Sequence, residues 1–586
     1  MLDRAALYLR TLAPLKGSQL VYLPLRRLQR MTRARPVLAR RPPGTGPVDA
    51  LARALRAMGP GDESARLATA AAVLAGRFRF LNHEERLERI DWTRRQVSHL
   101  WSYNLHYFDY AVDLAWAHLL TGRREFADRF VELARGWIEG TRSGRGDGWE
   151  PYAVSVRIVN WIGALLLLGS AVEPAARQRL HRSLAAQLRW LERRLERHLL
   201  ANHLQKNYLA LAIGGLYLAG RDAERWRAAG VDGLWRELEE QVLPDGAHFE
   251  RSPMYHALAL GDYLLAIALL HGAGRAAPGV AIARVSRMAA ALAVLSREDG
   301  RLHLFNDAAD GIAPPRARLL GLAEQVLGNR VAEPRGAVSL PDAGYYGYVG
   351  GPGGDRFLID CGEPGPAYQP GHAHCDLLSY ELDLAGVPVV VDSGVSGYEG
   401  DPLREYVRST RAHNTATLAG CEQSEVWGAF RVARRAQPLD ARIEGDSGGI
   451  RFEGAYRPYF DRRLVHRRRV EGRPGSWRVA DQFTGADAAR AVSYLHLHPE
   501  FEVEAIEPGR IVARSPRLAV AIEPFGVERV EIARGARDPA QGWYCPEFGV
   551  RSPALALELH AVATSTGQFG YRIAALGGQR SRAGTH

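Results

Sequence analysis

The sequence predicts a multidomain α+β protein in which an N-terminal, incomplete (α/α) toroid precedes a C-terminal antiparallel β-sandwich. Up to about residue 330, apolar residues recur at the spacing of amphipathic helices. Beyond that point, short strand-like runs follow one another without a helical period. The 586 residues also exceed what one hydrophobic core normally holds. We therefore divide the chain into a basic arm with lead-in helices at 1–64, a toroid domain at 65–335 and a β-sandwich domain at 336–586.

The lead-in segment begins with a basic amphipathic arm over residues 1–40. Arg4, Arg10 and Lys16 interrupt its apolar stretches, so the arm lacks the apolar core of a signal peptide. No run of 18 apolar residues occurs in the chain, and we expect no transmembrane segment. Such an arm either touches a membrane surface or packs on the protein body, and we favour packing.

The toroid prediction depends on successive helical hairpins joined by short turns, such as those at 121–123 and 219–221. Amphipathic faces first occur at 67–74 and 111–120. Further helices are expected at 124–139, 154–171, 175–200, 203–219, 222–243, 253–272, 278–297 and 315–328. Many hairpins in a row without a strong sequence repeat indicate a toroid or a solenoid.

The β-sandwich prediction begins near Pro334, where the helical period ends. Strands are expected at 356–360, 376–386, 389–391, 464–471, 476–483, 492–498, 510–523, 528–533 and 554–565. Their close spacing, with no helices between them, favours antiparallel sheets.

The positive charge of the chain comes almost entirely from arginine. The net charge is +11, yet Lys16 and Lys206 are the only lysines, so arginine carries almost all of the positive charge. Arginine binds carboxylates and sulfates in bidentate fashion, which suits a polyanionic substrate, although a GC-rich coding bias has the same effect. No basic run interleaves with aromatics, so we do not expect nucleic acid as a partner. The four cysteines are widely spaced and form no CxxC pair, so neither a disulfide framework nor a cysteine zinc site is indicated.

A candidate metal site lies in the β half. His374, Asp392 and His413 form a two-histidine, one-carboxylate set that suits Zn²⁺ or a similar divalent ion. They are spaced by 18 and 21 residues, which suits neighbouring strands better than a zinc finger. The alternative is that the histidines satisfy buried polar contacts. His372 shares a strand face with His374 and could reach the same cleft.

Three polar clusters interrupt the helical half. The aromatic run 101–110 suits stacking on sugar rings, or it fills a core. Asn202 and His203 stand at a helix start, where asparagine could serve only as an N-cap. The connector 245–256 is rich in ionisable groups, and its Tyr255 is a proton-transfer candidate.

These groups suit β-elimination from a uronic acid polymer. A base removes the proton beside the carboxylate, donors stabilise the dianion that forms, and an acid protonates the leaving oxygen. Asparagine, histidine and tyrosine provide these functions. Hydrolysis needs two carboxyl groups astride the bond, and the sequence does not pair Glu250 convincingly with Asp307 or Asp376.

The ordered motifs resemble the heparinase II/III-like polysaccharide lyases over roughly residues 100–570. The resemblance rests on Asn202-His203, on the run 248–256, and on Gly371-His-Ala-His-Cys-Asp, Val391-Asp-Ser-Gly and Arg408-Ser-Thr-Arg-Ala-His-Asn-Thr. It implies a toroid with a β-sandwich, as in alginate lyases, and a lyase acting on an acidic polysaccharide. The alternatives are a non-catalytic polysaccharide-binding or assembly factor and a glycoside hydrolase.

The resemblance also implies residue roles. Asn202 and His372 would neutralise the uronate, Tyr255 would donate or shuttle protons, and His203 would act as base or carboxylate partner. Of two candidates for a second tyrosine, Tyr398 and Tyr406, we prefer Tyr406. A structural ion, expected to be zinc, would bind His374, Asp392 and His413, and no organic cofactor is expected. Substrate contacts are expected from Tyr103, Asn104, His106, Lys206, His248, Glu250 and Arg251.

Two aspects of the family pattern bear on substrate and location. Heparinase-type members have a glutamate where this chain has Lys206, which disfavours a heparin-like substrate. The runs 101–110 and 360–371 resemble a subgroup associated with bacterial exopolysaccharide. The family works in the cell envelope, whereas the N-terminus suggests the cytoplasm, and both locations remain open, as does the oligomeric state.

Overall fold

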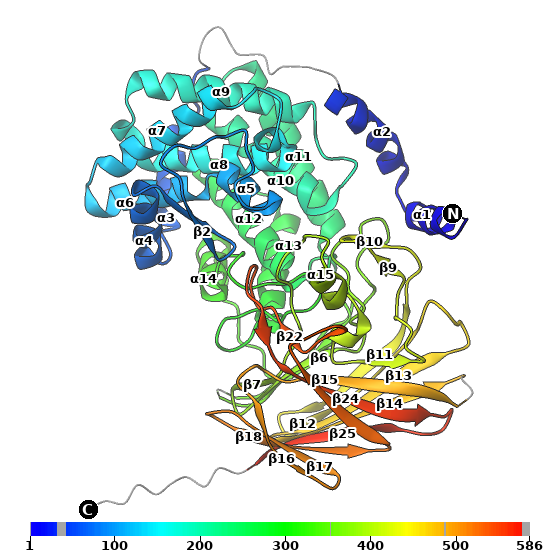
Figure 1. The fold of residues 1–586 in the computed structure, drawn as a ribbon. Coiled ribbons are helices and arrows are strands. Elements are labelled where there is room, and N and C mark those ends of the chain that lie inside the picture. The colour runs from blue at the N-terminus through cyan, green and yellow to red at the C-terminus, as the bar shows by residue number, and fades with distance from the viewer. Residues whose placement is uncertain (1, 32–42, 352, 486–487, 577–586) are drawn as a thin grey trace, which may run out of the picture.

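The computed structural model describes residues 2–31, 43–351, 353–485 and 488–576. Its helices and strands separate along the chain, with a helical half above a sheet-rich half in Figure 1. The predicted fold class is confirmed. The structure differs at the first boundary, because the helix at Val48–Ala57 packs against two helices of the helical half, which therefore starts before residue 65.

The helical half consists of antiparallel hairpins. Its helices are α3 (Val48–Ala57), α4 (Glu63–Leu74), α5 (His99–Tyr107), α6 (Asp109–Thr121), α7 (Glu125–Gly140), α8 (Pro151–Leu168), α9 (Pro174–Glu192), α10 (Ala201–Tyr217), α11 (Arg221–Gln241), α12 (Pro253–Gly272), α13 (Gly279–Val294) and α14 (Arg316–Leu327). The helix expected at 175–200 ends at Glu192, and an irregular segment leads to α10. A hairpin of β1 (Arg77–Phe80) and β2 (His83–Arg86) is inserted after α4.

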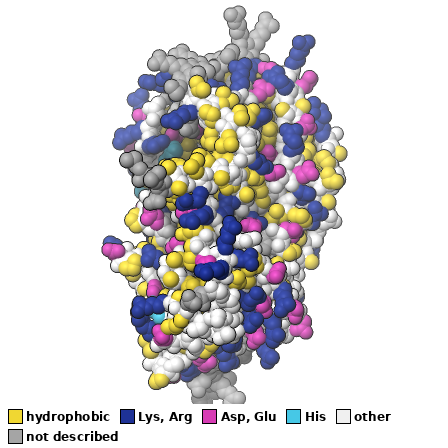
Figure 2. Space-filling model, turned by 90° about the vertical axis from the view of Figure 1, so that its right-hand side faces the viewer, with side chains coloured by type: hydrophobic (Ala, Val, Ile, Leu, Met, Phe, Trp, Pro, Cys, Tyr) yellow, Lys and Arg dark blue, Asp and Glu magenta, His cyan; other side chains and the backbone are white. Residues whose placement is uncertain are grey.

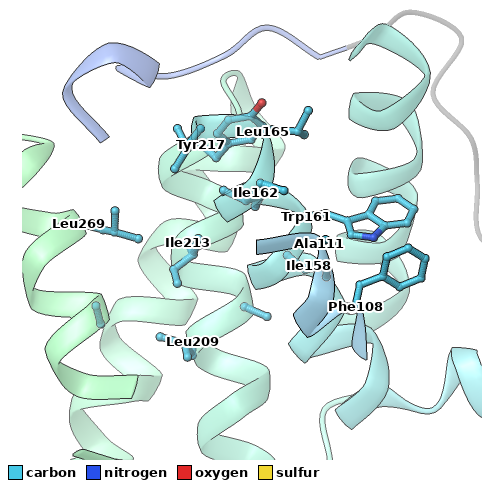
Figure 3. Close-up of a cluster of buried hydrophobic side chains, with 14 of the residues drawn as sticks. Phe108, Ala111, Ile158, Trp161, Ile162, Leu165, Leu209, Ile213, Tyr217 and Leu269 are labelled. Atoms are coloured by element: carbon cyan, nitrogen blue, oxygen red, sulfur yellow. The ribbon is translucent and has the colours of Figure 1, made fainter. Parts of the chain in front are cut away.

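The core of the helical half is continuous and apolar. In Figure 3, side chains of α6, α8 and α10, including Ala111, Ile162 and Ile213, point toward one another. Trp161 is fully buried and meets Phe108 edge to face. Burial of such side chains stabilises each by roughly 1.5–3 kcal/mol. The toroid helices are therefore held by packing rather than by helix propensity alone.

The sheet-rich half contains three larger antiparallel sheets. The first has the order β3-β4-β5-β6-β7, and it consists of β3 (Gly336–Leu340), β4 (Tyr345–Val349), β5 (Arg356–Asp360), β6 (Tyr380–Leu384) and β7 (Val387–Val390). The eight-stranded sheet has the order β11-β12-β13-β14-β25-β18-β17-β16, and the four-stranded sheet has the order β19-β24-β15-β8.

The strands of these two sheets have the following bounds: β8 (Ala416–Leu418), β11 (Gln437–Asp446), β12 (Gly449–Arg457), β13 (Val465–Arg473), β14 (Ser476–Thr484), β15 (Ala489–His496), β16 (Glu502–Glu507), β17 (Arg510–Arg514), β18 (Ala519–Phe525), β19 (Arg529–Arg534), β24 (Leu555–Ala563) and β25 (Phe569–Leu576). The single strand expected at 510–523 is two strands, β17 and β18.

A buried ion-pair network joins the two halves. Arg297, which follows α13, donates to Glu381 at 2.9 Å and also to Asp383, both on β6. His303 donates to the same Glu381 carboxylate. Burial alone would raise the pKa of Glu381, but Arg297 and His303 lower it to about 2. The carboxylate therefore stays charged at neutral pH.

We expect Glu381→Gln to lower the free energy of unfolding by about 3 kcal/mol, because it leaves the buried Arg297 charge less compensated. Urea denaturation measures this change. The control is Glu471→Gln, which breaks an exposed pair with Arg451 and should change stability by less than about 1 kcal/mol. Equal effects of the two substitutions would contradict the role of the network.

Two helical segments of the described chain, Pro151–Ala171 and Pro253–Gly272, are long and apolar enough for a membrane span by length and composition. Of each apolar window, 67% is buried inside the molecule. A core helix meets the same criteria, so the two segments are weak evidence for a span.

Candidate active site

The candidate site lies where loops of the sheet-rich half meet helix starts of the helical half. Tyr255 is in the first turn of α12, where Pro253 fixes the first helical position and the Ser252 hydroxyl accepts from the Tyr255 backbone N–H. The Ser252 hydroxyl also donates to the backbone carbonyl of Asp307 at 2.7 Å. Helix capping thus joins α12 to the loop that carries Asp307.

Tyr255, Tyr398 and His372 form the centre of the site. The two tyrosine hydroxyls are 2.9 Å apart, and the His372 ring centroid lies 4.1 Å from that of Tyr255 and 6.0 Å from that of Tyr398. Tyr398 belongs to the loop between β7 and α15 (Pro402–Val407), and His372 to the loop between β5 and β6. All three side chains are only partly buried, so each keeps some exposure to solvent.

The phenols of this centre are held in their protonated form. Burial raises the pKa of both Tyr255 and Tyr398 well above 10, and the facing hydroxyl raises that of Tyr255 further. A neutral phenol is a proton donor. The pair can therefore protonate a leaving oxygen at neutral pH.

Asp307 organises the histidine side of the site. Its carboxylate accepts from His372 Nδ1 and from His374 Nε2, each at 2.9 Å, and from both terminal nitrogens of Arg404. Burial alone would raise the pKa of Asp307, but Arg404 and the two histidines hold it well below its usual range. Because a carboxylate only accepts, His372 presents Nδ1–H to Asp307 and keeps Nε2 for another partner.

The amide and the second imidazole enter from α10. Asn202 Nδ2 lies 3.2 and 3.4 Å from the two carboxylate oxygens of the buried Glu250. The side chain of Asn202 does not cap α10, which excludes the N-cap interpretation. Burial raises the pKa of Glu250, while His372, Asn202 and His203 oppose the rise.

His203 has its own carboxylate partner. Its Nδ1 lies 3.2 Å from Oε1 of the buried Glu196, and its ring centroid lies 4.7 Å from that of Tyr152. Burial works against the charged ring, but Glu196 outweighs it and raises the pKa of His203. With Nδ1–H directed at Glu196, Nε2 is the nitrogen available to a substrate.

The preference for Tyr406 as the second tyrosine is wrong. Tyr406 is almost fully buried in α15, and its hydroxyl donates to Gln541 at 2.8 Å. Tyr398 supplies the hydroxyl that meets Tyr255.

Three residues predicted to contact substrate, His106, His248 and Glu250, are buried, and the two histidines belong to the core. His106 is 4% exposed, and its Nδ1 accepts from Trp137 Nε1 at 3.1 Å. His248 is 1% exposed and bonds Gln241 at 3.0 Å. Burial lowers the pKa of each to about 3, so both are neutral core histidines.

Two predicted cationic contacts are satisfied within the protein. Lys206 lies 2.5 Å from Asp262 in a partly buried ion pair. The guanidinium of Arg251 donates to the backbone carbonyl of Ala343 at 2.9 Å. The Lys206 charge is therefore compensated, whereas the Arg251 guanidinium is positioned by backbone carbonyls.

Tyr103 and Asn104 are partly exposed on α5. Tyr103 stacks on Tyr107 with ring planes 6° apart, and Asn104 donates to the backbone carbonyl of Leu100. Their contact with substrate stays a prediction.

Sequence patterns did not predict that Asp307 and Arg404 belong to this site. They also did not show that Tyr398, rather than Tyr406, is the second tyrosine. Asn306 accepts from the His374 backbone N–H, and Asp307 bonds His372 and His374. The only available signal was an acidic loop with two histidines far away along the chain.

The predicted metal ligands are neighbours but do not form a closed set. His413 Nδ1 lies 2.8 Å from Asp392, and the His374 and His413 ring centroids are 5.3 Å apart. Within the described ranges, only Glu531, Glu558 and His560 have ligand atoms all within 4.8 Å of one another. However, His374 Nδ1 and His413 Nε2 are buried without a hydrogen-bond partner. Orphaned buried nitrogens are compatible with ligation.

Comparison with known proteins agrees with this architecture. Residues 60–315 match the heparinase II/III N-terminus, and residues 332–572 match the heparinase II/III-like C-terminal domain. The chain belongs to the heparinase II/III-like family. It is 26% identical to a heparin-sulfate lyase of Pedobacter heparinus over 357 residues, which is 54% of this chain and only 51% of that relative. It is also 24% identical to FtsZ-localized protein C of Caulobacter vibrioides over 70% of this chain and 72% of that protein.

Solved structures show the heparinase II/III-like fold directly. Heparinase III aligns with a TM-score of 0.70 at 18% identity, covering 89% of this chain and 86% of the other. A mutant of the heparan sulfate lyase HepC from Pedobacter heparinus aligns with a TM-score of 0.60 at 20% identity, covering 89% and 85%. At such identities the likeness concerns the fold alone.

Proposed function

We propose that this protein is a polysaccharide lyase that cleaves an acidic, uronate-containing polysaccharide by β-elimination. The observation that carries the proposal is the Tyr255–Tyr398 hydroxyl pair beside His372, together with the Asn202–Glu250 contact. Heparinase II/III family membership supports the lyase class. A bacterial exopolysaccharide, met in the cell envelope or at its cytoplasmic side, is the substrate class that we favour.

Each residue of the site has one role in the elimination. His203 Nε2 takes the proton from C5, because Glu196 fixes Nδ1–H and raises the basicity of the ring. The electron pair forms the C4–C5 double bond as the C4–O bond breaks, and the leaving oxygen takes a proton from the Tyr255 phenol. Asn202 donates to the uronate carboxylate, where negative charge accumulates, and so does Nε2–H of His372 when its ring carries a second proton in addition to the Nδ1–H bonded to Asp307.

A hydrolytic mechanism lacks its second carboxyl group. The Asp307 oxygens accept from Arg404, His372 and His374, which leaves no free carboxyl to attack or to activate water. Asp376 is buried and accepts from the Asn306 backbone N–H. Glu250 alone cannot serve both faces of a glycosidic bond.

The experiment is a panel of uronate polymers incubated with the purified protein. Elimination creates an unsaturated product and raises ultraviolet absorbance together with new reducing ends. New reducing ends without that absorbance would identify a hydrolase and overturn the proposal.

A second candidate is a non-catalytic polysaccharide-binding or assembly role. The relative named as FtsZ-localized aligns with more of this chain than the named lyase does. Tyr255→Phe separates the candidates, because a binding protein would keep its affinity and its cellular role, whereas a lyase would lose turnover.

The Glu196–His203 pair predicts the pH dependence. His203 must be deprotonated to act as base, so activity falls as pH drops below its raised pKa. Glu196→Gln removes the charge that raises this pKa, and the acidic limb of kcat/KM should move to lower pH. Glu192→Gln, which alters an exposed pair with Arg225, is the control and should leave the limb in place. An unchanged limb in Glu196→Gln would exclude His203 as the base.

We also propose that His374, Asp392 and His413 hold a structural divalent ion, with zinc as the expected metal. A bound ion would fix three loops of the sheet-rich half and would satisfy the orphaned nitrogens. We expect metal analysis of the purified protein to find about one ion per chain. His374→Ala should lower the melting temperature, whereas the kcat of the fraction that stays folded should change little. Folded wild-type protein without any divalent ion would reject the site.

A further inference from the structure

The two N-terminal helices, α1 (Leu2–Leu12) and α2 (Gly17–Met31), lie along the outside of the molecule (Figure 1). They extend from the helical half to the hairpin of β9 (Val426–Trp427) and β10 (Arg431–Val432). They touch the body mainly through polar groups. Arg10 pairs with Glu425, Lys16 with Glu240, and Arg26 with Glu150. Gln19 is buried and donates to two backbone carbonyls of the body.

The apolar side of the same helices faces outward. Of the sixteen exposed large hydrophobic side chains in the described residues, eight lie between residues 8 and 28. They are Tyr8 (42%), Leu9 (68%), Leu12 (43%), Leu20 (51%), Val21 (64%), Leu23 (39%), Leu25 (40%) and Leu28 (58%). In the view toward this side, hydrophobic side chains gather over the upper part of the molecule, with Lys and Arg around them (Figure 2).

This orientation is the reverse of an ordinary surface helix, which buries its apolar side and exposes its polar side. Tyr8 meets an aromatic ring of the body, with its ring centroid 4.9 Å from that of Trp427. The remaining apolar side chains keep a large area in water, which is unfavourable unless something covers it. The packing expected for this arm therefore applies only to its polar side.

The charge of the arm indicates what covers the apolar side. Residues 1–31 hold six basic side chains, and Asp3 is their only acidic one. Arg4 and Arg27 are exposed beside the leucines. A second copy would bring the same positive charge against this one, whereas anionic lipid headgroups would attract it.

We propose that α1 and α2 dock the protein on an anionic membrane surface, with Leu9, Leu20, Val21 and Leu28 inserted between headgroups. Helices with an apolar side flanked by arginine lie in the plane of such an interface. The ion pairs of Arg10, Lys16 and Arg26 then hold the body against the docked arm. The proposal is independent of the catalytic function.

The test is co-flotation of the full-length protein with vesicles of phosphatidylcholine alone and with added phosphatidylglycerol. We expect binding to the mixed vesicles, weakened by salt, and little binding to the neutral ones. The triple variant Leu9→Gln, Val21→Gln, Leu28→Gln should bind about tenfold more weakly or worse. Arg4→Gln with Arg27→Gln should weaken binding to the anionic vesicles.

The matched control is Val280→Gln with Ile506→Gln, which removes side chains of 81% and 69% exposure elsewhere on the surface and should leave binding unchanged. Circular dichroism verifies that every variant is folded. Wild-type protein that stays with the unbound fraction would overturn the proposal, as would a triple variant that floats like the wild type. A wild-type dimer that the triple variant converts to a monomer would assign the apolar side to a second copy and would also overturn it.

Discussion

Tyr255→Phe should lower kcat by about 10³-fold while leaving polysaccharide affinity within about twofold. The substitution removes one hydroxyl from the 2.9 Å pair with Tyr398 and keeps the ring beside His372. The leaving oxygen then lacks its proton donor, whereas the carboxylate contacts of Asn202 and His372 remain. Steady-state rates and equilibrium binding of the same polymer separate the two effects.

The matched control is Tyr406→Phe, because Tyr406 also follows Asp392 in the chain but donates to Gln541. Its kcat should stay close to that of the wild type. Tyr398→Phe should have an intermediate effect, since Tyr398 contacts the donor without replacing it. If Tyr406→Phe were as inactive as Tyr255→Phe, the assignment of the hydroxyl pair would be wrong.

Asp307→Asn should lower kcat by about 10²- to 10⁴-fold, by analogy with the loss of an orienting aspartate in a catalytic triad. An amide cannot accept equally from Arg404, His372 and His374, so His372 loses the bond that fixes its Nδ1–H. The buried Arg404 charge is also left without its carboxylate, which should cost about 3–5 kcal/mol in the free energy of unfolding. Kinetics at a temperature where the variant is folded measure the first effect, and urea denaturation measures the second.

Asp310→Asn, three residues further along the same loop, is the control. Its carboxylate accepts from the Leu302 backbone N–H, and burial raises its pKa to about 6, so the loss of charge should cost little. A purely structural role for Asp307 would lower stability but leave kcat and its pH profile unchanged in the folded fraction. That result would remove Asp307 from the description of the site.

Helix bounds were predicted well where neighbouring residues in the sequence determine them. The helix expected at 253–272 has those bounds because Ser252 caps it and Pro253 starts it. The helix expected at 175–200 ends early because the irregular segment after Glu192 brings Glu196 to His203, a contact that helical periodicity cannot reveal. Strands β11 and β12 were missed for different reasons: β11 is a largely exposed edge strand with a weak apolar pattern, whereas β12 does show the alternation of a half-buried strand, which was overlooked.

The site was predictable in composition but not in geometry. Asn202, Tyr255 and His372 do gather around Glu250 and the tyrosine pair. Sequence distance could not show whether Tyr398 or Tyr406 points toward Tyr255. Tyr398 lies in the loop before α15 and Tyr406 lies within α15, so their side chains have different surroundings. Nor could it show that His106 belongs to the core, because burial is set by tertiary packing.

The most direct measurement of the central claim uses heavy-oxygen water. The account predicts that products formed from a uronate polymer in this solvent are lighter by one water than hydrolysis products, because elimination breaks the C4–O bond without adding water. Their new reducing ends, reduced at once to prevent exchange of the anomeric oxygen with solvent, carry no label. Mass spectrometry that finds saturated products, with one labelled oxygen per cleavage at the new reducing end, would contradict β-elimination and the roles given to Tyr255 and His203.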